Sequence, residues 1–355
     1  MKKIRILFLA SADAGNVNAQ SLNAREIASR LDATRFEISL FYSDQSDPRL
    51  RNRDNIRLLP LPRRFQTLSI LKEMLIGPEI IAYLDCSPAS YLYVHLPRAL
   101  RRRTRTVLHL EGPANFEGTD PLFRHLYHGV VRRCDAWTAI TGWIAQYYQG
   151  SLKRKPSGVL PVGVDCGFFA PPGKDVRKGS TVLFVGSLLL RKGALDVVQA
   201  ASHFPEVKFR MIGAGRNGFE QIVAGKIAEL GVGNVFLEGT KPQAQIAQAM
   251  HESDVLLLPS RSEGLPKVTL EAAAAGLPCI VFRDYETPSV VDGVTGFQVA
   301  NRQEMIEKLS LLLHDPQLRI RMGAAAQQHA QQFDWNQISG SWEQAYLAIS
   351  ASAGR

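Results

Sequence analysis

Short apolar runs rich in β-branched residues alternate with stretches of helical periodicity along most of the chain. In the first half these runs are KIRILFLAS, FEISLFYS, EIIAYLD, RTVLHLEG and AWTAIT, and the stretch NAQSLNAREIASRL has apolar residues at helical spacing. In the second half they are TVLFVGS, VKFRMIG, NVFLEG, DVLLLPS and PCIVF. Apolar strands that alternate with helices are typical of parallel sheets covered on both faces, so we predict a doubly wound α/β fold.

The middle of the chain interrupts this alternation. The segment KRKPSGVLPVGVDCGFFAPPGKDVRKGS is rich in Pro, Gly and Lys, as connections between domains often are. A length of 355 residues also exceeds the size of most single cores. We therefore predict two tandem Rossmann-like domains, residues 1–163 and 164–339. Ligands of such sheets bind beyond the carboxyl ends of the strands, and an interdomain cleft would suit a pair of substrates.

Composition adds that the chain is an ordinary globular protein, with 45% hydrophobic and 21% charged residues. No apolar run approaches the length needed to span a bilayer. Arg5 interrupts the apolar start of the chain, so we interpret this stretch as a buried strand rather than a signal peptide. The four cysteines have no paired spacing, which favours reduced thiols in a cytoplasmic protein and argues against a zinc site: Cys86, Cys134, Cys166 and Cys279.

The net positive charge is confined to the first half of the chain. Residues 1–165 carry 24 Lys and Arg against 15 Asp and Glu, whereas the remainder of the 42 basic and 33 acidic residues balance at 18 each. The first half is therefore expected to face something anionic, either a phosphate-bearing substrate or a membrane surface.

Two neighbouring segments sharpen this expectation. The run RALRRRTRT, with Arg101, Arg102 and Arg103, is either a solvated face or a contact with anionic lipid or a lipid-linked diphosphate acceptor. The stretch QTLSILKEML has apolar residues at helical spacing, which would rest on a membrane or face the core. Nucleic acid is not an expected partner, because no aromatic residues are interleaved with the basic ones.

The stretch SRSEGLPKVTLEAAAAG carries two glutamates, Glu263 and Glu271, behind the strand SDVLLLPS. Pro266 suits the first position of a helix that ends at about Gly276, and the free N–H groups of its first turn form a site for phosphate. Acids are poor phosphate ligands, so the two glutamates are expected to accept hydroxyl groups of a sugar or a ribose. The alternative is structural: Glu271 pairs with Lys267 on the helix surface, and Glu263 is a solvated loop residue.

The segment GSLLLRKG places Arg191 and Lys192 in the loop between the strand TVLFV and the next helix. Two cations and a glycine at such a loop suit a diphosphate. The alternative is a basic pair that is merely solvated at the start of a helix.

The chain resembles the retaining glycosyltransferases of family 4, which have the GT-B fold. The matching segments are PVGVD, FVGSLLLRKG, MIGAG, FLEGT, SDVLLLPSRSEGLPKVTLEAAAAGLPCIV, DGVTGFQV and FDW, with AGN and LHLEG as looser matches in the first domain. The resemblance implies that a C-terminal helix, residues 340–355, packs back on the first, acceptor-binding domain. It also implies that the second domain binds a nucleotide-sugar.

Site residues follow from the resemblance. It implies that Glu271 binds the ribose, that Glu263 and His109 face the donor sugar, and that Lys192 holds the diphosphate, which makes His109, Glu263 and Lys192 the catalytic candidates. The further donor-binding candidates are Gly15, Ser187, Arg191, Gly213, Gly215, Gly264, Leu265, Lys267, Val268 and Thr269. Without the resemblance, a histidine at the end of TVLHL would be interpreted as a satisfied core residue.

The chemistry expected at these residues is the departure of a nucleoside diphosphate. Cations and helix amides stabilise the charge that builds on its oxygens, so we predict neither a metal nor another cofactor. Asp-x-Asp, the metal-binding motif of the other large glycosyltransferase fold, does not occur in the chain. Ser187 replaces an arginine that the family usually has, and we hypothesise that Arg191 supplies the missing charge. DYETPS replaces the family's glycine-rich turn, which leaves the donor sugar open.

Two other functions compete with this interpretation. The segment GAGRNG, from Gly213 to Gly218, matches the dinucleotide fingerprint and favours an NAD-dependent enzyme, although it follows the second strand of its domain. A non-catalytic homologue that binds nucleotide-sugars is the other alternative. We expect a cytoplasmic retaining glycosyltransferase, peripheral at the inner membrane face, that uses a UDP- or GDP-linked sugar. Its acceptor would be a carbohydrate or a lipid-linked molecule, in the synthesis of cell-surface polysaccharide or glycolipid.

Overall fold

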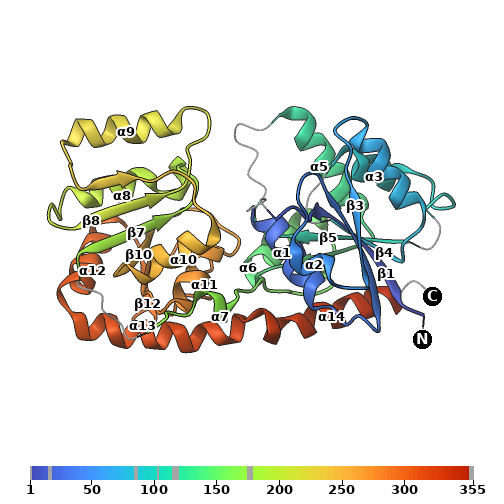
Figure 1. Ribbon diagram of the computed structural model, residues 1–355. Helices are drawn as coiled ribbons and strands as arrows, with labels where there is room; N and C mark the ends of the chain where they lie inside the picture. The colour runs from blue at the N-terminus through green and yellow to red at the C-terminus, as the bar shows by residue number, and fades with distance from the viewer. Residues whose placement is uncertain are drawn as a thin grey trace. The chain divides into compact units, whose positions relative to one another are not determined.

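A computed structural model describes residues 2–14, 18–83, 87–101, 104–113, 120–173 and 179–351. The chain forms two compact units (Figure 1). The first unit combines Met1–Val162 with Trp335–Arg355, and the second consists of Gly163–Asp334.

The first unit is built on a six-stranded parallel sheet with the strand order β3-β2-β1-β4-β5-β6. Its strands are β1 (Ile4–Ser11), β2 (Phe36–Tyr42), β3 (Ile56–Pro60), β4 (Ile80–Tyr83), β5 (Arg105–Leu110) and β6 (Ala136–Ala139). Its helices are α1 (Ala19–Arg30), α2 (Pro48–Arg51), α3 (Gln66–Leu75), α4 (Pro88–His95), α5 (Pro121–Arg133), α6 (Gly142–Leu152) and α14 (Trp335–Ala351).

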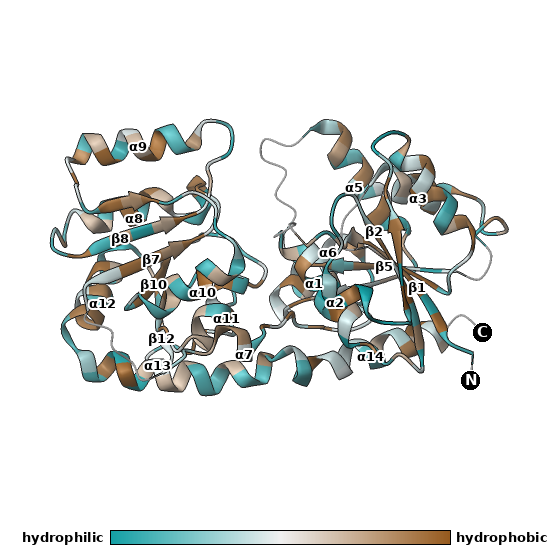
Figure 2. Ribbon diagram, viewed as in Figure 1, coloured by the Kyte–Doolittle hydropathy of each residue, from teal (hydrophilic) through white to brown (hydrophobic). Residues whose placement is uncertain are grey.

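Local sequence explains where these elements lie. The centre of β1 is buried on both faces, as the apolar run predicts, and β1 is drawn mostly in brown in Figure 2. Several helices begin at a short polar residue whose side chain accepts a backbone N–H of the first turn: Asn18, Ser87, Asp120 and Thr141. Such caps satisfy the amides that helix geometry leaves without an intrahelical partner.

The last helix, α14, is part of the core of the first unit. The Tyr346 ring meets Phe8 of β1 edge to face, with ring centroids 5.8 Å apart. The indole N–H of Trp342 donates to the carbonyl of Pro161 at 3.0 Å. Both aromatic side chains are almost completely buried, so α14 contributes large apolar surface to this unit although it is the last helix of the chain.

The second unit has a second six-stranded parallel sheet, in the order β12-β11-β10-β7-β8-β9. Its strands are β7 (Thr181–Val185), β8 (Lys208–Ile212), β9 (Val235–Leu237), β10 (Val255–Leu258), β11 (Cys279–Phe282) and β12 (Gly296–Val299). Its helices are α7 (Cys166–Phe169), η1 (Leu190–Lys192), α8 (Ala194–Ala201), α9 (Phe219–Leu230), α10 (Gln243–His251), α11 (Lys267–Ala274), α12 (Arg302–His314), α13 (Pro316–Ala330) and η2 (Gln331–Phe333).

In this sheet the chain runs from β7 outward to β9 and then returns to the other side of β7 as β10. The strand order therefore reverses between β7 and β10, and the loops at the carboxyl ends of these two strands diverge there. At the opposite end, the buried Asp254 carboxylate accepts the amides of Gly179, Ser180 and Thr181 at 2.6–2.9 Å. These bonds fix the start of β7 beside the start of β10.

The two parallel sheets with flanking helices confirm the predicted pair of doubly wound α/β units (Figure 1). Two edge strands, β3 and β12, were not predicted from the apolar runs. Within the described ranges, every helix is too short or too polar to cross a bilayer.

Candidate active site

Two loops of the second unit are tied together at the point where its strand order reverses. The loop after β7 contains η1 with Arg191 and Lys192, and the loop after β10 leads into α11. The Arg261 amide donates to the Arg191 carbonyl at 2.8 Å, and the Ser260 hydroxyl lies 3.2 Å from the same carbonyl oxygen. These bonds place the predicted cations beside the glutamate-bearing loop.

Lys192 and Glu263 form the centre of this cluster. The Lys192 ammonium is ion-paired with Oε1 of Glu263, and the Ser260 hydroxyl donates to the same oxygen at 2.7 Å. The Arg191 guanidinium lies 3.9 Å from the second carboxylate oxygen and donates to the Ser262 carbonyl at 3.2 Å. The side chains of Lys192 and Glu263 are only 18% and 11% exposed, so solvent screens their attraction less than that of a surface pair.

The glycines of these loops allow backbones to approach closely. Gly193 has a φ of +73°, and a Cβ there would lie 2.2 Å from the Pro259 carbonyl oxygen. A Cβ on Gly213, whose φ is +145°, would lie 1.9 Å from the Gly186 carbonyl oxygen. The first glycine of GAGRNG is therefore required for loop packing.

The helix α11 begins one residue later than predicted. Pro266 is the N-cap residue rather than the first helical residue, and its carbonyl accepts both the amide and the hydroxyl of Thr269, at 3.0 and 2.7 Å. Helix geometry leaves the amides of Lys267 and Val268 without an intrahelical acceptor. Gly276 has a φ of +65° just after the helix, as a C′ glycine should. Gly264 and Leu265, which precede the helix, are buried.

Glu271 is a buried carboxyl group in the middle of α11. Burial raises its pKa above the usual range, and the positive charge of Lys267 opposes this effect. The Lys267 ammonium donates to the Gly163 carbonyl at 3.4 Å. Glu271 thus lies in the helix that follows β10, at the reversal of the strand order.

His109 has the contacts of a core residue. Its Nδ1 lies 2.6 Å from the Thr138 hydroxyl and its Nε2 lies 2.9 Å from the Tyr346 hydroxyl. The Trp342 ring meets it edge to face at 5.0 Å, and burial lowers its pKa to about 3. With 3% of its surface exposed, the ring is neutral and both nitrogens are engaged, as the core alternative describes.

The remaining predicted residues are placed as follows. Ser187 is half-buried in the loop after β7, and Gly215 packs against Glu220 at the start of α9. Arg101 is buried, so it does not belong to a solvated basic face. Gly15, Arg102 and Arg103 lie outside the described residues.

Sequence reasoning missed several side chains beside the cluster. The Ser260 hydroxyl donates to Glu263, and the Ser289 hydroxyl lies 2.6 Å from that of Thr269, which was predicted. The hydroxyls of Tyr285 and Thr287, in the DYETPS segment, are buried. Burial, together with the negative charge of Glu263, raises the pKa of Tyr285. Only the proximity of these residues to the glutamate loop identifies them.

Potential metal ligands do not converge here. Over the part of the chain that the structure describes, no three His, Cys, Asp or Glu side chains gather as ligands of one ion would.

Comparison with known proteins finds similarity mainly in the second unit. Residues 172–329 match the family model described as glycosyl transferases group 1. The sulfoquinovosyl transferase SQD2 of Arabidopsis thaliana is 31% identical over 162 residues, which is 43% of this chain and 30% of SQD2. A D-inositol 3-phosphate glycosyltransferase of Segniliparus rotundus is 29% identical over 64% of this chain and 56% of its own length. The chain thus spans about half or less of these two relatives.

The fold is also similar to that of solved structures over nearly the whole chain. HepE from Anabaena, crystallised with UDP and glucose, has a TM-score of 0.78 and 17% sequence identity, covering 97% of this chain and all of that one. This similarity shows the shared GT-B fold.

Proposed function

We propose that this chain, whose second unit matches the model of group 1 glycosyl transferases, transfers a sugar from a nucleoside-diphosphate sugar to an acceptor hydroxyl. In this reaction the bond between the sugar's anomeric carbon and the diphosphate breaks, and a bond to the acceptor oxygen forms. The acceptor hydroxyl loses its proton, and the nucleoside diphosphate leaves with the electron pair of the broken bond.

The observation that carries this proposal is the cluster of Arg191, Lys192 and Glu263 at the strand-order reversal of the second sheet. Developing negative charge on a leaving diphosphate needs cations and amides that are already in place. Lys192 and Arg191 would supply the cations, and the first amides of α11 would supply hydrogen bonds.

The donor would displace contacts that exist without it. Because Lys192 is ion-paired with Glu263, a bound diphosphate would take over the ammonium and release the carboxylate toward the sugar hydroxyls. Glu271 would bind the ribose, and Arg191 would replace the arginine that the family has where this chain has Ser187. HepE was crystallised with UDP and glucose, so a UDP-sugar is our first choice of donor and a GDP-sugar the second.

Three finer points belong to this proposal. Transfer would retain the anomeric configuration, and it would need no metal ion, because the cations named above would neutralise the leaving group. The acceptor would be a carbohydrate or a lipid-linked molecule bound mainly by the basic first unit.

The test is the thermal stability of the full chain with UDP, GDP, ADP, CMP and NAD, each with magnesium and with EDTA. Binding to the folded state raises the melting temperature. We expect one nucleoside diphosphate to raise it equally under both conditions. A shift with NAD alone would support the dinucleotide alternative instead, although GAGRNG follows β8 and not the first strand β7. No shift with any nucleoside diphosphate would contradict the proposal.

A further inference from the structure

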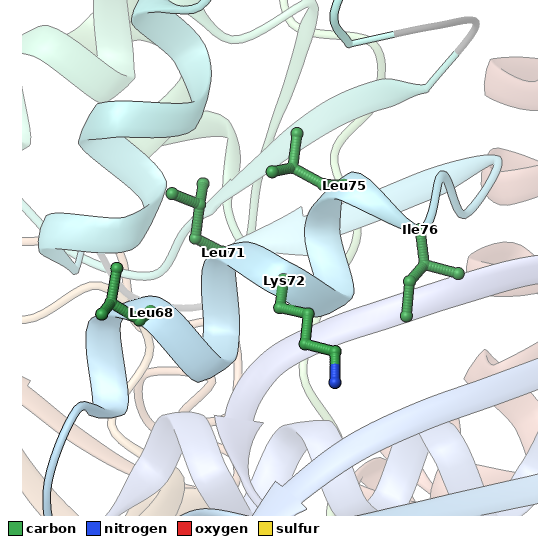
Figure 3. A pocket seen from close by; sticks show the side chains of 5 residues that line it. All are labelled: Leu68, Leu71, Lys72, Leu75 and Ile76. Atoms are coloured by element: carbon green, nitrogen blue, oxygen red, sulfur yellow. The ribbon is translucent and has the colours of Figure 1, made fainter.

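The helix α3 of the first unit exposes apolar side chains where a surface helix normally exposes polar ones. Leu68, Leu75 and Ile76 are exposed, and Lys72 lies among them. Together with Leu71 they line a shallow cavity of about 500 Å³ (Figure 3). We call the exposed residues Phe65, Leu68, Lys72, Leu75 and Ile76 the α3 face.

Helix geometry shows that the α3 face is opposite to the core. Met74 is fully buried and marks the inward side of the helix. Leu68, Lys72, Leu75 and Ile76 fall within an arc of about 100° on the other side. Burial in the first unit therefore does not account for this apolar stripe.

Phe65 extends the apolar stripe beyond the start of the helix. It is 76% exposed, which makes it the most exposed large hydrophobic side chain of the described chain. Its backbone has a φ of +60° in the left-handed region, which is sterically disfavoured for residues other than glycine. No side-chain cap compensates at this helix start. An exposed aromatic ring held on a disfavoured backbone is the combination expected where a surface contact is required.

The charge around the α3 face is positive. Arg63 and Arg64 are exposed directly before Phe65, and Lys72 is exposed on the stripe itself. The acidic residue of the helix, Glu73, has a side chain that is 15% exposed and is ion-paired with Arg57 at 3.3 Å. Apolar side chains flanked by uncompensated basic ones match the boundary between acyl chains and anionic headgroups.

We propose that the α3 face docks the first unit on an anionic lipid surface, with Phe65 and Leu68 entering the acyl boundary and Arg63, Arg64 and Lys72 at the phosphates. A second copy of the chain fits less well, because a symmetric contact through this face would bring the same basic residues together. The surface lies in the first unit and does not depend on the proposed donor site.

The test is flotation of the full chain with vesicles of phosphatidylglycerol and phosphatidylcholine, compared with vesicles of phosphatidylcholine alone. We expect binding to the anionic vesicles that weakens as salt is added. Phe65→Gln combined with Leu68→Gln should weaken partitioning by about tenfold or more, since the apolar contact is lost. Arg63→Gln combined with Arg64→Gln should weaken it by about fivefold per charge.

A matched control removes two other exposed apolar residues, from the second unit, as Ile222→Gln with Ile320→Gln. This control should bind vesicles as the wild type does. All variants should keep the wild-type melting temperature and its shift with UDP, which separates lipid docking from folding and from the donor site. The proposal is overturned if the wild type does not bind anionic vesicles, or if the Phe65/Leu68 variant binds them as strongly as the wild type does. It is also overturned if light scattering shows that the wild type is a dimer and that the Phe65/Leu68 variant is a monomer.

Discussion

Replacing Lys192 by methionine is the sharpest perturbation of the candidate site. The substitution keeps most of the side chain's length and removes the ammonium that is ion-paired with Glu263. If Lys192 holds the leaving diphosphate, the transition state loses one preorganised cation. The loss of a comparable charge-stabilising group costs about 10²–10³ in kcat, or roughly 3–4 kcal/mol.

The same substitution should also affect folding, by a different amount. Without Lys192, the Glu263 carboxylate keeps the Ser260 hydroxyl and lies 3.9 Å from Arg191. Because the pair is partly buried, its disruption should cost about 1–3 kcal/mol, between the values for exposed and buried pairs. Adding Glu263→Gln should restore part of this stability, because no uncompensated carboxylate remains.

The assay measures release of UDP from a UDP-sugar, with kcat and KM determined separately, alongside urea unfolding. Lys226→Met is the matched control, since Lys226 pairs with Glu229 on the surface of α9 of the same unit. The control should keep wild-type turnover and lose less than about 0.5 kcal/mol of stability. The reasoning is refuted if Lys192→Met turns over at the wild-type rate while its stability falls as expected, because Lys192 would then be a structural residue only.

Three further predictions concern single residues. Arg191→Ala should lower kcat by about tenfold or more, measured by the same UDP release, and unchanged turnover would remove its role as the replacement for the missing arginine. Burial raises the pKa of Glu271, so its carboxylate form, which would accept the ribose hydroxyls, is lost as the pH falls through that raised pKa. The UDP affinity measured by calorimetry should therefore weaken toward acid pH, and Glu271→Gln should abolish this pH dependence. His109 has a pKa lowered to about 3, against about 6.5 when unfolded, so stability should fall by about 1.4 kcal/mol per unit as pH drops through this window. Urea unfolding of His109→Gln should show a smaller loss of stability toward acid pH than the wild type, and an equal loss of stability would contradict the burial argument.

The central strands of both sheets could be predicted because strands that are buried on both faces consist of consecutive apolar residues. β10 is buried at every position, and its sequence VLLL reflects this directly. The edge strands lack that pattern. β3 has one buried residue, Leu59, among exposed and half-buried ones, and the polar Gln298 interrupts the apolar residues of β12. Gly296 begins β12 because a Cβ there would lie 2.2 Å from the Cys279 carbonyl oxygen, which is a tertiary constraint.

Residues of the candidate site could be predicted where a sequence motif indicates the residue type and where adjacent strands bring two such residues together. Lys192 and Glu263 meet because β7 and β10 are adjacent in the sheet. His109 shows the limit of such reasoning. Its partner Tyr346 lies 237 residues later in the chain, and no local pattern shows that a hydroxyl from α14 will occupy its second nitrogen. The buried hydroxyls of Tyr285 and Thr287 depend on tertiary packing in the same way.

The central claim is that the second unit binds and activates a nucleoside-diphosphate sugar through the loops after β7 and β10. Its most direct test is the rate at which the full chain releases nucleoside diphosphate from a panel of UDP- and GDP-sugars, with and without EDTA. We predict slow release from one donor, unchanged by EDTA and at least about a hundredfold slower in Lys192→Met. Release from no donor on the panel, or equal release by the Lys192 variant, would contradict this account.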